Sequence, residues 1–438
     1  MREKRVTTFE YTEFEYELIE EDEEEGFEDR KLYLTENSIE ELERLNESLK
    51  FAVIGRRKIK VLNYAGVVGF GNVRLEILPK FLKRKYDKGL LTPDEIEDRG
   101  KILSNLLEML KHARKLNVKE TDLTTLGYEK EDFFEIFVYL FAKNLLNLLK
   151  CKVDASYVRR YDELSFVKGK IDIRRYASNP AKLHTVPCTF YERSIDNPIN
   201  RTLKYVCYLL SKKVSPENYR LLKQILAILD PVTLSPIDAN YVKRITFNRL
   251  NIEFKPFIDF CEMILRSSTL SLQGTQIEFF SILFPMEKLF EEFVAEVIKT
   301  ESLHREVFGD SYLQIQEKIG YFVTKPTEMF KLIPDIVIKA GNESYVIDTK
   351  YKLLDLEDRK LGVSQQDLYQ IYVYCKELNA KKALLLYPRE LNGKEIEQDF
   401  TLRDEIEVFV RTISLDHDLK EGWNDFVSKL KEVLDCLA

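Results

Sequence analysis

Two β-branched runs, IPDIVIKA and ESYVIDTKY, flank a Gly-Asn pair in the last third of the chain. A two-residue connection that begins with glycine is typical of a β-hairpin, because glycine adopts positive φ values freely. With the turn centred on Gly341 and Asn342, Asp335 of the first strand faces Asp348 of the second, with Cβ atoms about 5 Å apart. Facing carboxylates repel each other, so this pairing predicts a cation between them. Lys350 points to the same face as Asp348, because side chains alternate along a strand.

Two carboxylates and one ammonium group on a single sheet face suit a hard divalent cation. Mg²⁺ prefers a few carboxylates, retained waters and phosphate oxygens, and we expect Mg²⁺ here with Mn²⁺ as an alternative. Such a metal lowers the pKa of a bound water and stabilises charge that develops on a phosphate. Lys350 would then orient or deprotonate the attacking water, or neutralise that charge. The alternative is a solvated hairpin with incidental charges, since exposed edges are rich in charged side chains.

The segments around the hairpin predict a compact domain. Between residues 285 and 415 the patterns favour a helix, a strand at about 311–323, the hairpin, a helix and a strand, an order typical of an α/β domain with a mixed sheet. Glu291 on the first helix would supply a third carboxylate. Gln370 and Tyr374, spaced i and i+4 on QQDLYQIYVYCKEL, share one helix face. Taken singly, each has a simpler interpretation that is favoured: Glu291 as a solvated helix flank and Tyr374 as an ordinary core-edge aromatic.

The whole chain predicts an α+β multidomain protein. Its 438 residues suggest two to four domains at about 150 residues each. We expect a β-rich module over 1–90, a mainly helical region with a β segment near 151–195 over 91–280, and the α/β domain over 281–438. The acidic run at 20–25 is expected to be an exposed loop.

The charge is distributed unevenly. Net charge is −7 overall, but residues 151–205 hold eleven Lys or Arg and six Asp or Glu, a local excess of five positive charges. This patch suits confined phosphate contacts and equally suits a salt-bridged surface. The predicted DNA-contacting residues are Arg159, Arg160, Lys168, Lys170, Arg174 and Arg175.

The sequence disfavours several classes of protein. There is no run of about 18 apolar residues and no apolar segment of a secretory signal at the N-terminus, so no membrane partner is expected. The six cysteines are scattered, which fits reduced thiols and a cytoplasmic location. No G-x-x-x-x-G-K-[ST] occurs, so this chain alone is not expected to bind a nucleotide.

These motifs together resemble a known family. Pro334-Asp335 followed by Asp348-Thr349-Lys350 resembles the PD-(D/E)xK nuclease motif, and Gln370 to Tyr374 resembles the QxxxY motif of its RecB-like branch. The longer segments YAG at 64, ILPK at 77, GKI at 169, NPINRTLK at 197, PMEKLFE at 285 and KALLLYP at 382 are similar to the McrC family. McrC is the nuclease subunit of McrBC-type modification-dependent restriction systems. The resemblance runs from about 50 to 415.

The resemblance implies a specific activity and a specific partner. McrC proteins pair with a McrB-type AAA+ GTPase that forms hexameric rings and reads modified cytosine, dock through their N-terminal region, stimulate GTP hydrolysis and cut double-stranded DNA. It implies metal binding by Asp335, Asp348 and Glu291, with Lys350, Gln370 and Tyr374 completing the catalytic site. The leading hypothesis is therefore a Mg²⁺-dependent endonuclease subunit of a methylcytosine-type restriction complex.

Two alternatives stay open. In the first alternative, the chain is an adaptor that activates the GTPase, and Arg56, Arg57 or Arg74 acts near the partner's nucleotide like an arginine finger. Surface arginines without such a role are the simpler interpretation of each of these three. The second alternative is a RecB-like repair nuclease with the same site.

Overall fold

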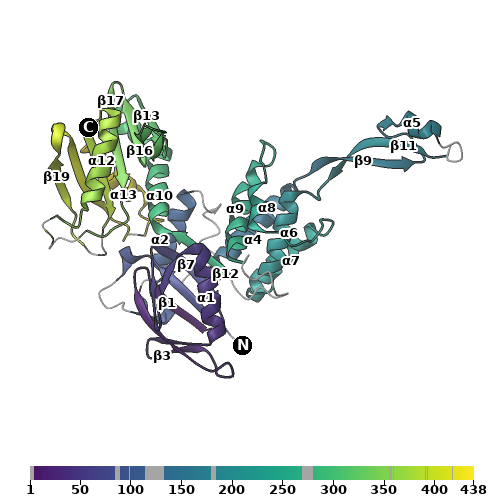
Figure 1. The fold of residues 1–438 in the computed structure, drawn as a ribbon, viewed down its shortest axis with the longest axis horizontal. Coiled ribbons are helices and arrows are strands. Elements are labelled where there is room, and N and C mark those ends of the chain that lie inside the picture. The colour runs from purple at the N-terminus through teal and green to yellow at the C-terminus, as the bar shows by residue number, and fades with distance from the viewer. Residues whose placement is uncertain are drawn as a thin grey trace. The chain divides into compact units, whose positions relative to one another are not determined.

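The computed structural model describes residues 4–83, 89–97, 99–113, 133–178, 184–268, 280–354, 358, 360–389, 391, 393–416 and 418–438. It divides into two compact units (Figure 1). The first combines the described residues of Met1–Leu116, Thr124–Phe134 and Glu278–Ala438, and the second contains those of Glu135–Ile277. The predicted boundaries at 90 and 280 remain a prediction. Helix α2 (Arg99–His112), expected in the middle region, belongs to the first unit. Within the described residues, no helix is long and apolar enough to cross a membrane.

Two sheets form the N-terminal part of the first unit. One has the order β3-β4-β2-β6-β5 and the other the order β1-β8-β7-β12. Their apolar faces share a core that includes Phe14, Phe51 and Phe70. The strands are β1 (Lys4–Phe9), β2 (Glu13–Leu18), β3 (Gly26–Glu28), β4 (Lys31–Leu34), β5 (Ala52–Ile54), β6 (Lys58–Val61), β7 (Tyr64–Phe70), β8 (Val73–Leu78) and β12 (Phe280–Pro285).

Helix α1 (Glu36–Leu49) interrupts this β-rich module, and the sequence analysis did not anticipate it. Thr35 caps the helix by accepting a hydrogen bond from the Ser38 backbone. The acidic run is also only partly the exposed loop that was expected. Glu25 is buried and accepts hydrogen bonds from Thr35 and from the Asn72 backbone N–H, at 2.8 Å for Asn72. Glu25 therefore joins the helix start to the β7–β8 turn, while residues 20–24 are exposed.

Strand β12 lies far from the N-terminus in sequence but completes the N-terminal sheet. It pairs antiparallel with β7, from Phe280 opposite Gly69 to Pro285 opposite Tyr64. Gly66 has φ of 140°, and a Cβ at this position would lie 1.9 Å from the Ile282 carbonyl oxygen. The close approach of the two strands therefore requires glycine here.

The C-terminal part of the first unit is built on a six-stranded mixed sheet of order β13-β16-β17-β18-β20-β19. β18 is parallel to both β17 and β20, and the remaining pairs are antiparallel. The predicted mixed sheet is thus confirmed. Its strands are β13 (Ser311–Ile315), β16 (Ile336–Ala340), β17 (Glu343–Thr349), β18 (Lys382–Pro388), β19 (Glu397–Thr401) and β20 (Glu407–Ile413).

The prediction of a single strand at about 311–323 is wrong, because two separate strands lie in this range. After β13 the chain turns at Gln316, which has a positive φ of 50°, and begins a separate hairpin. That hairpin consists of β14 (Gly320–Val323) and β15 (Met329–Leu332).

Helices cover this sheet. The helix predicted from QQDLYQIYVYCKEL is α12 (Gln365–Leu378), which begins with a capping box of Ser364 and Asp367 and contacts β17 and β18. α13 (Trp423–Asp435) contacts β20, and α10 (Met286–Thr300) contacts α2 (Arg99–His112) and α11 (Leu303–Phe308). The predicted helix beginning after Pro285 is therefore confirmed.

The second unit combines helices with a long β arm. Its helices are α4 (Phe133–Cys151), α6 (Pro198–Leu210), α7 (Pro216–Ile228), α8 (Ala239–Lys243) and α9 (Lys255–Ser268). β9 (Ser156–Leu164) and β11 (Val186–Ser194) pair antiparallel over nine residues, with β10 (Lys170–Ile171) beside β11. Figure 1 shows β9 and β11 extending from the helices, with α5 (Ile173–Ser178) beside their far part. We call β9, β10, α5 and β11, with the described residues that connect them, the arm.

Candidate active site

The β16–β17 hairpin has the register that its turn predicts. Ile336 faces Ile347 and Ala340 faces Glu343, which places Asp335, just before β16, beside Asp348 near the end of β17. Gly341 has φ of 58°, as a turn of this kind requires. The turn chemistry alone was therefore enough to bring the two aspartates together.

Asp335 is held by the opposite strand. Its Oδ2 accepts hydrogen bonds from the Thr349 backbone N–H at 2.7 Å and from the Thr349 hydroxyl at 2.9 Å. Burial and the nearby charge of Glu291 nevertheless raise the pKa of Asp335 to about 7. Thr349 was not among the predicted site residues. Its position between Asp348 and Lys350 was the one sequence feature that placed it in the site.

Asp348 is fully buried at the centre of the site. Burial and the charge of Asp335 raise its pKa to about 7. Lys350 Nζ lies 2.6 Å from Asp348 Oδ2, whereas Oδ1 accepts no hydrogen bond from the residues that the structure describes. A buried carboxylate oxygen without a donor is costly, so this atom points to a missing cationic partner.

A chain of hydrogen bonds fixes Lys350. Its Nζ donates to Gln370 Oε1 at 3.0 Å, Gln370 Nε2 donates to the Tyr374 hydroxyl at 2.9 Å, and that hydroxyl donates to the Ile333 carbonyl at 3.1 Å. Burial alone would lower the pKa of Lys350, but the charges of Asp348 and Asp335 outweigh it and the pKa is raised. Lys350 is therefore held as a cation. The structure brings together all three of these predicted residues.

Glu291 lies on α10, half-buried, and its charge acts on Asp335. Its Oε1 accepts a hydrogen bond from Gln316 Nε2. Within the described residues, no group of three His, Cys, Asp or Glu side chains is arranged to hold a metal ion. The predicted three-carboxylate set is thus not preformed. Asp335 and Asp348 alone fit a hard cation that keeps several waters as its remaining ligands.

The six predicted DNA-contacting residues all lie on the arm. Arg159 and Arg160 belong to β9, and Arg174 and Arg175 belong to α5. Lys168 lies just before β10, and Lys170 is the first residue of β10. Some already have acidic or aromatic partners in the arm: Glu192 lies 3.6 Å from Arg160 and 3.7 Å from Lys168, and Arg175 stacks on Tyr161 at 4.9 Å. The arm also exposes Tyr157, Phe166 and Tyr191. It therefore presents basic and aromatic groups side by side.

The three candidate activating arginines have different settings. Arg56 and Arg57 are exposed in the connection between β5 and β6. Arg74 is buried on β8, 5.1 Å from the Phe134 ring, so it is poorly placed to reach a partner's nucleotide.

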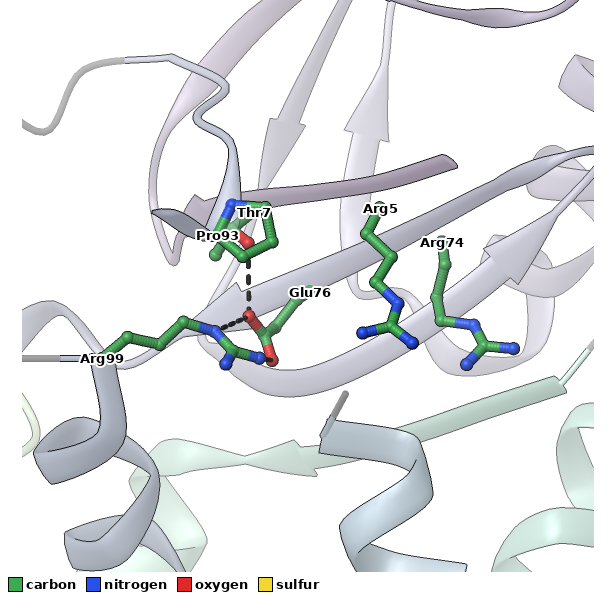
Figure 2. A pocket seen from close by; sticks show the side chains of 6 residues that line it. All are labelled: Arg5, Thr7, Arg74, Glu76, Pro93 and Arg99. Atoms are coloured by element: carbon green, nitrogen blue, oxygen red, sulfur yellow. Dashed lines mark hydrogen bonds and ion pairs between the residues drawn. The ribbon is translucent and has the colours of Figure 1, made fainter. Parts of the chain in front are cut away.

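Arg74 lines a small polar pocket (Figure 2). In that pocket Arg99 binds Glu76 through two hydrogen bonds of 2.9 and 2.7 Å, and the Thr7 hydroxyl also donates to Glu76. Arg5 faces Arg74 across the parallel β1–β8 pair, and Figure 2 shows their side chains running in the same direction.

Fold and site together define a multi-part α/β protein with two adjacent carboxylates, one of them fully buried, and a lysine at the end of a sheet hairpin. The chain belongs to the family described as McrBC 5-methylcytosine restriction system component, whose model matches residues 59–388. A search of curated proteins finds no match.

Two solved structures from Thermococcus gammatolerans have similar folds. One is a refined half-complex from a tetradecameric assembly of McrB AAA+ hexamers with bound McrC; its matching chain is 22% identical, with a TM-score of 0.70 over 99% of this chain and 100% of that chain. The other is the McrBC complex, whose matching chain is also 22% identical, with a TM-score of 0.52 over 67% of this chain and 87% of that chain.

Proposed function

We propose that the chain is the Mg²⁺-dependent DNA endonuclease subunit of a methylcytosine-type restriction complex. The observation that carries the proposal is the placement of Asp335 and the fully buried Asp348 beside Lys350, with Asp348 Oδ1 lacking a donor among the described residues. The PD-(D/E)xK resemblance of these residues and the family match support the same class of reaction.

Each residue has a defined task in this proposal. Asp335 and Asp348 would hold Mg²⁺, with Glu291 acting through a retained water. Bound there, Mg²⁺ supplies a more acidic water and charge stabilisation on the phosphate. Lys350 donates hydrogen bonds to the attacking water or to the negative charge that develops on the phosphate. Gln370 fixes the Lys350 ammonium group, and Tyr374 fixes Gln370.

The test is cleavage of modified DNA by the complex assembled with its GTPase. Asp348→Asn and Lys350→Ala should each lower the cleavage rate by at least about 10³-fold, a loss of the size seen when a catalytic group is removed. Both variants should still assemble with the partner. Lys339→Ala, an exposed lysine at the far end of the same hairpin, is the matched control and should cut normally. Normal cutting by either site variant would refute the assignment.

The partner in this proposal is a McrB-like AAA+ GTPase hexamer. The similar Thermococcus structure is described as McrB AAA+ hexamers with bound McrC, and this chain's similarity covers the full length of the matching chain. We propose that the N-terminal sheets dock on the ring and that exposed Arg56 or Arg57 assists GTP hydrolysis. Arg56→Ala with Arg57→Ala should lower the stimulated GTPase rate while leaving complex assembly unchanged. A chain that stimulates the GTPase but never cuts modified DNA would favour the adaptor alternative.

The DNA contact in this proposal is the arm. Its basic side chains suit phosphate groups, and its exposed tyrosines suit packing against sugars or bases. This assignment rests on the chemistry of the arm and is independent of the cutting site.

A further inference from the structure

A buried polar cluster joins the N-terminal sheet to the segment that carries Lys350. Glu10 follows β1 and is 1% exposed, and Tyr351 is 3% exposed. Glu10 Oε1 accepts hydrogen bonds from the Lys80 backbone N–H at 2.7 Å and from the Tyr351 hydroxyl. Lys80 is the last residue of the ILPK motif, for which the proposed function gives no role.

The Lys80 side chain also contacts Tyr351 directly. Its Nζ donates to the Tyr351 carbonyl oxygen at 2.9 Å and lies 4.4 Å from the Tyr351 ring centroid. Phe81 and Phe290 pack against that ring at centroid distances of 6.4 and 6.0 Å. Tyr351 is therefore bound at its hydroxyl, its ring and its carbonyl.

This cluster is expensive to bury. Burial raises the pKa of Glu10 to about 7 and lowers the pKa of Lys80. Glu10 Oε2 also accepts no hydrogen bond from the described residues. Burying charged and polar groups costs free energy that apolar side chains would not, so stability alone is a weak reason for such a cluster. A role in holding specific geometry is the better explanation.

The cluster lies next to Lys350, whose position depends on the backbone on either side of it. β17 ends at Thr349, and the backbone N–H of Lys350 makes one more bond to the Leu386 carbonyl at 2.8 Å. Residues 351–354 follow without regular structure. After Lys350, Lys80 binds the Tyr351 carbonyl and Glu10 binds the Tyr351 hydroxyl, while the next residue, Lys352, binds Asp367 of α12 at 3.0 Å.

We propose that Glu10, Lys80 and Tyr351 are positioning residues that fix the backbone after Lys350 and so place its ammonium group beside Asp348. The N-terminal sheet is then a structural part of the cutting site. The proposal rests on the proposed nuclease function, and it goes beyond that function by assigning residues about 270 and 340 positions away in sequence to the same site.

Two measurements on the full chain test the proposal. Hydrogen–deuterium exchange reports directly on the Lys350 amide, and single-turnover cleavage by the assembled complex reports on the site. Tyr351→Phe and Lys80→Met should speed exchange of the 348–354 segment and lower the cleavage rate about 10- to 100-fold, since small misplacements of a catalytic group have effects of this size. The affinity for DNA and GTPase stimulation should stay within twofold of wild type.

Matched variants separate positioning from general damage. Tyr345→Phe removes another tyrosine hydroxyl bonded to a carboxylate on β17 and should change neither measurement. Glu10→Gln keeps the accepting Oε1 and should cut nearly as well as wild type, whereas Glu10→Ala should not. Unchanged exchange or unchanged cleavage in Tyr351→Phe and Lys80→Met overturns the proposal, as does an equal fall in cleavage and GTPase stimulation.

Asp348→Asn separates this proposal from the proposed function. If Asp348→Asn still cuts DNA, the nuclease assignment fails, while the exchange data still decide whether the cluster holds the segment. If Asp348→Asn is inactive and exchange is unaltered in the cluster variants, only the positioning role fails.

Discussion

Thr349 donates both its backbone N–H and its hydroxyl to one oxygen of Asp335, so the strand that carries Asp348 also orients the opposing carboxylate. Both hydrogen bonds are made to Oδ2 of Asp335. They also favour the ionised form of Asp335 against burial and the charge of Glu291, which raise its pKa to about 7.

Thr349→Val should therefore impair the site while preserving its shape. Loss of the hydroxyl donor raises the pKa of Asp335 further, so the pH–rate profile for cleavage should move to higher pH, with a roughly tenfold slower rate at neutral pH because a hydrogen bond to a charged group is lost. Thr412→Val, at a buried threonine of β20 in the same sheet, is the control and should leave the profile in place. A profile shifted to lower pH would contradict this account.

The raised pKa values of Asp335 and Asp348 also predict how stability depends on pH without metal. Because burial and mutual repulsion raise the pKa values of this pair, the folded state holds protons on it at pH values where the unfolded chain has lost them. The folded state therefore binds more protons in this window, and its free energy of unfolding should fall as pH rises, by about 1.4 kcal/mol per pH unit for each extra proton.

Denaturant unfolding of wild type and Asp348→Asn across pH 4 to 7 checks this expectation. The substituted protein should gain stability relative to wild type as the pH rises. Added Mg²⁺ should remove the difference at neutral pH by stabilising the ionised pair of the wild type. A constant difference between the two proteins would show that Asp348 titrates normally.

The arm predicts a salt-dependent DNA contact. Arg159→Glu with Arg160→Glu should weaken DNA binding and reduce the slope of the logarithm of affinity against the logarithm of salt concentration, because fewer counterions are released. Arg220→Glu with Lys223→Glu, two exposed basic residues on α7 of the same unit, is the control for the equal change in net charge. Equal effects of the two changes would mean that general electrostatics, and not the arm, sets the affinity.

Gly66 predicts a large stability difference between two glycine substitutions. Gly66→Ala places a methyl group against the Ile282 carbonyl in a backbone conformation with φ of 140° and should cost about 3 kcal/mol or more. Gly341→Ala, with φ of 58° and open space around the new methyl group, should cost only about 1 kcal/mol. Denaturant unfolding of both variants measures the difference.

The parts of the site that depend on local sequence were predictable. The Gly-Asn turn determines which residues face each other in the hairpin, and the apolar spacing with Ser364 predicts α12, so Asp335, Asp348, Gln370 and Tyr374 could be placed together. The parts that depend on distant pairing were not. Tyr351 meets Glu10 across 341 positions, and nothing in either local pattern indicates that contact.

Helix α1 and the burial of Arg74 were also not predicted, each for a different physical reason. α1 carries Ile39, Leu42, Leu45 and Leu49 at helical spacing after a Thr cap, so its signal was present in a segment interpreted as β. Arg74 was expected at the surface because arginine usually is exposed, but β8 lies between β1 and β7, where even charged side chains become buried.

The position of β12 has a consequence for dividing the chain experimentally. A fragment that ends at residue 280 would remove the outer strand of the N-terminal sheet and leave the backbone donors and acceptors of β7 open, and an open apolar edge promotes self-association. A fragment that ends at residue 285 would keep the edge covered. A fragment that carries the complete N-terminal sheet should therefore end with β12, the strand that leads into α10.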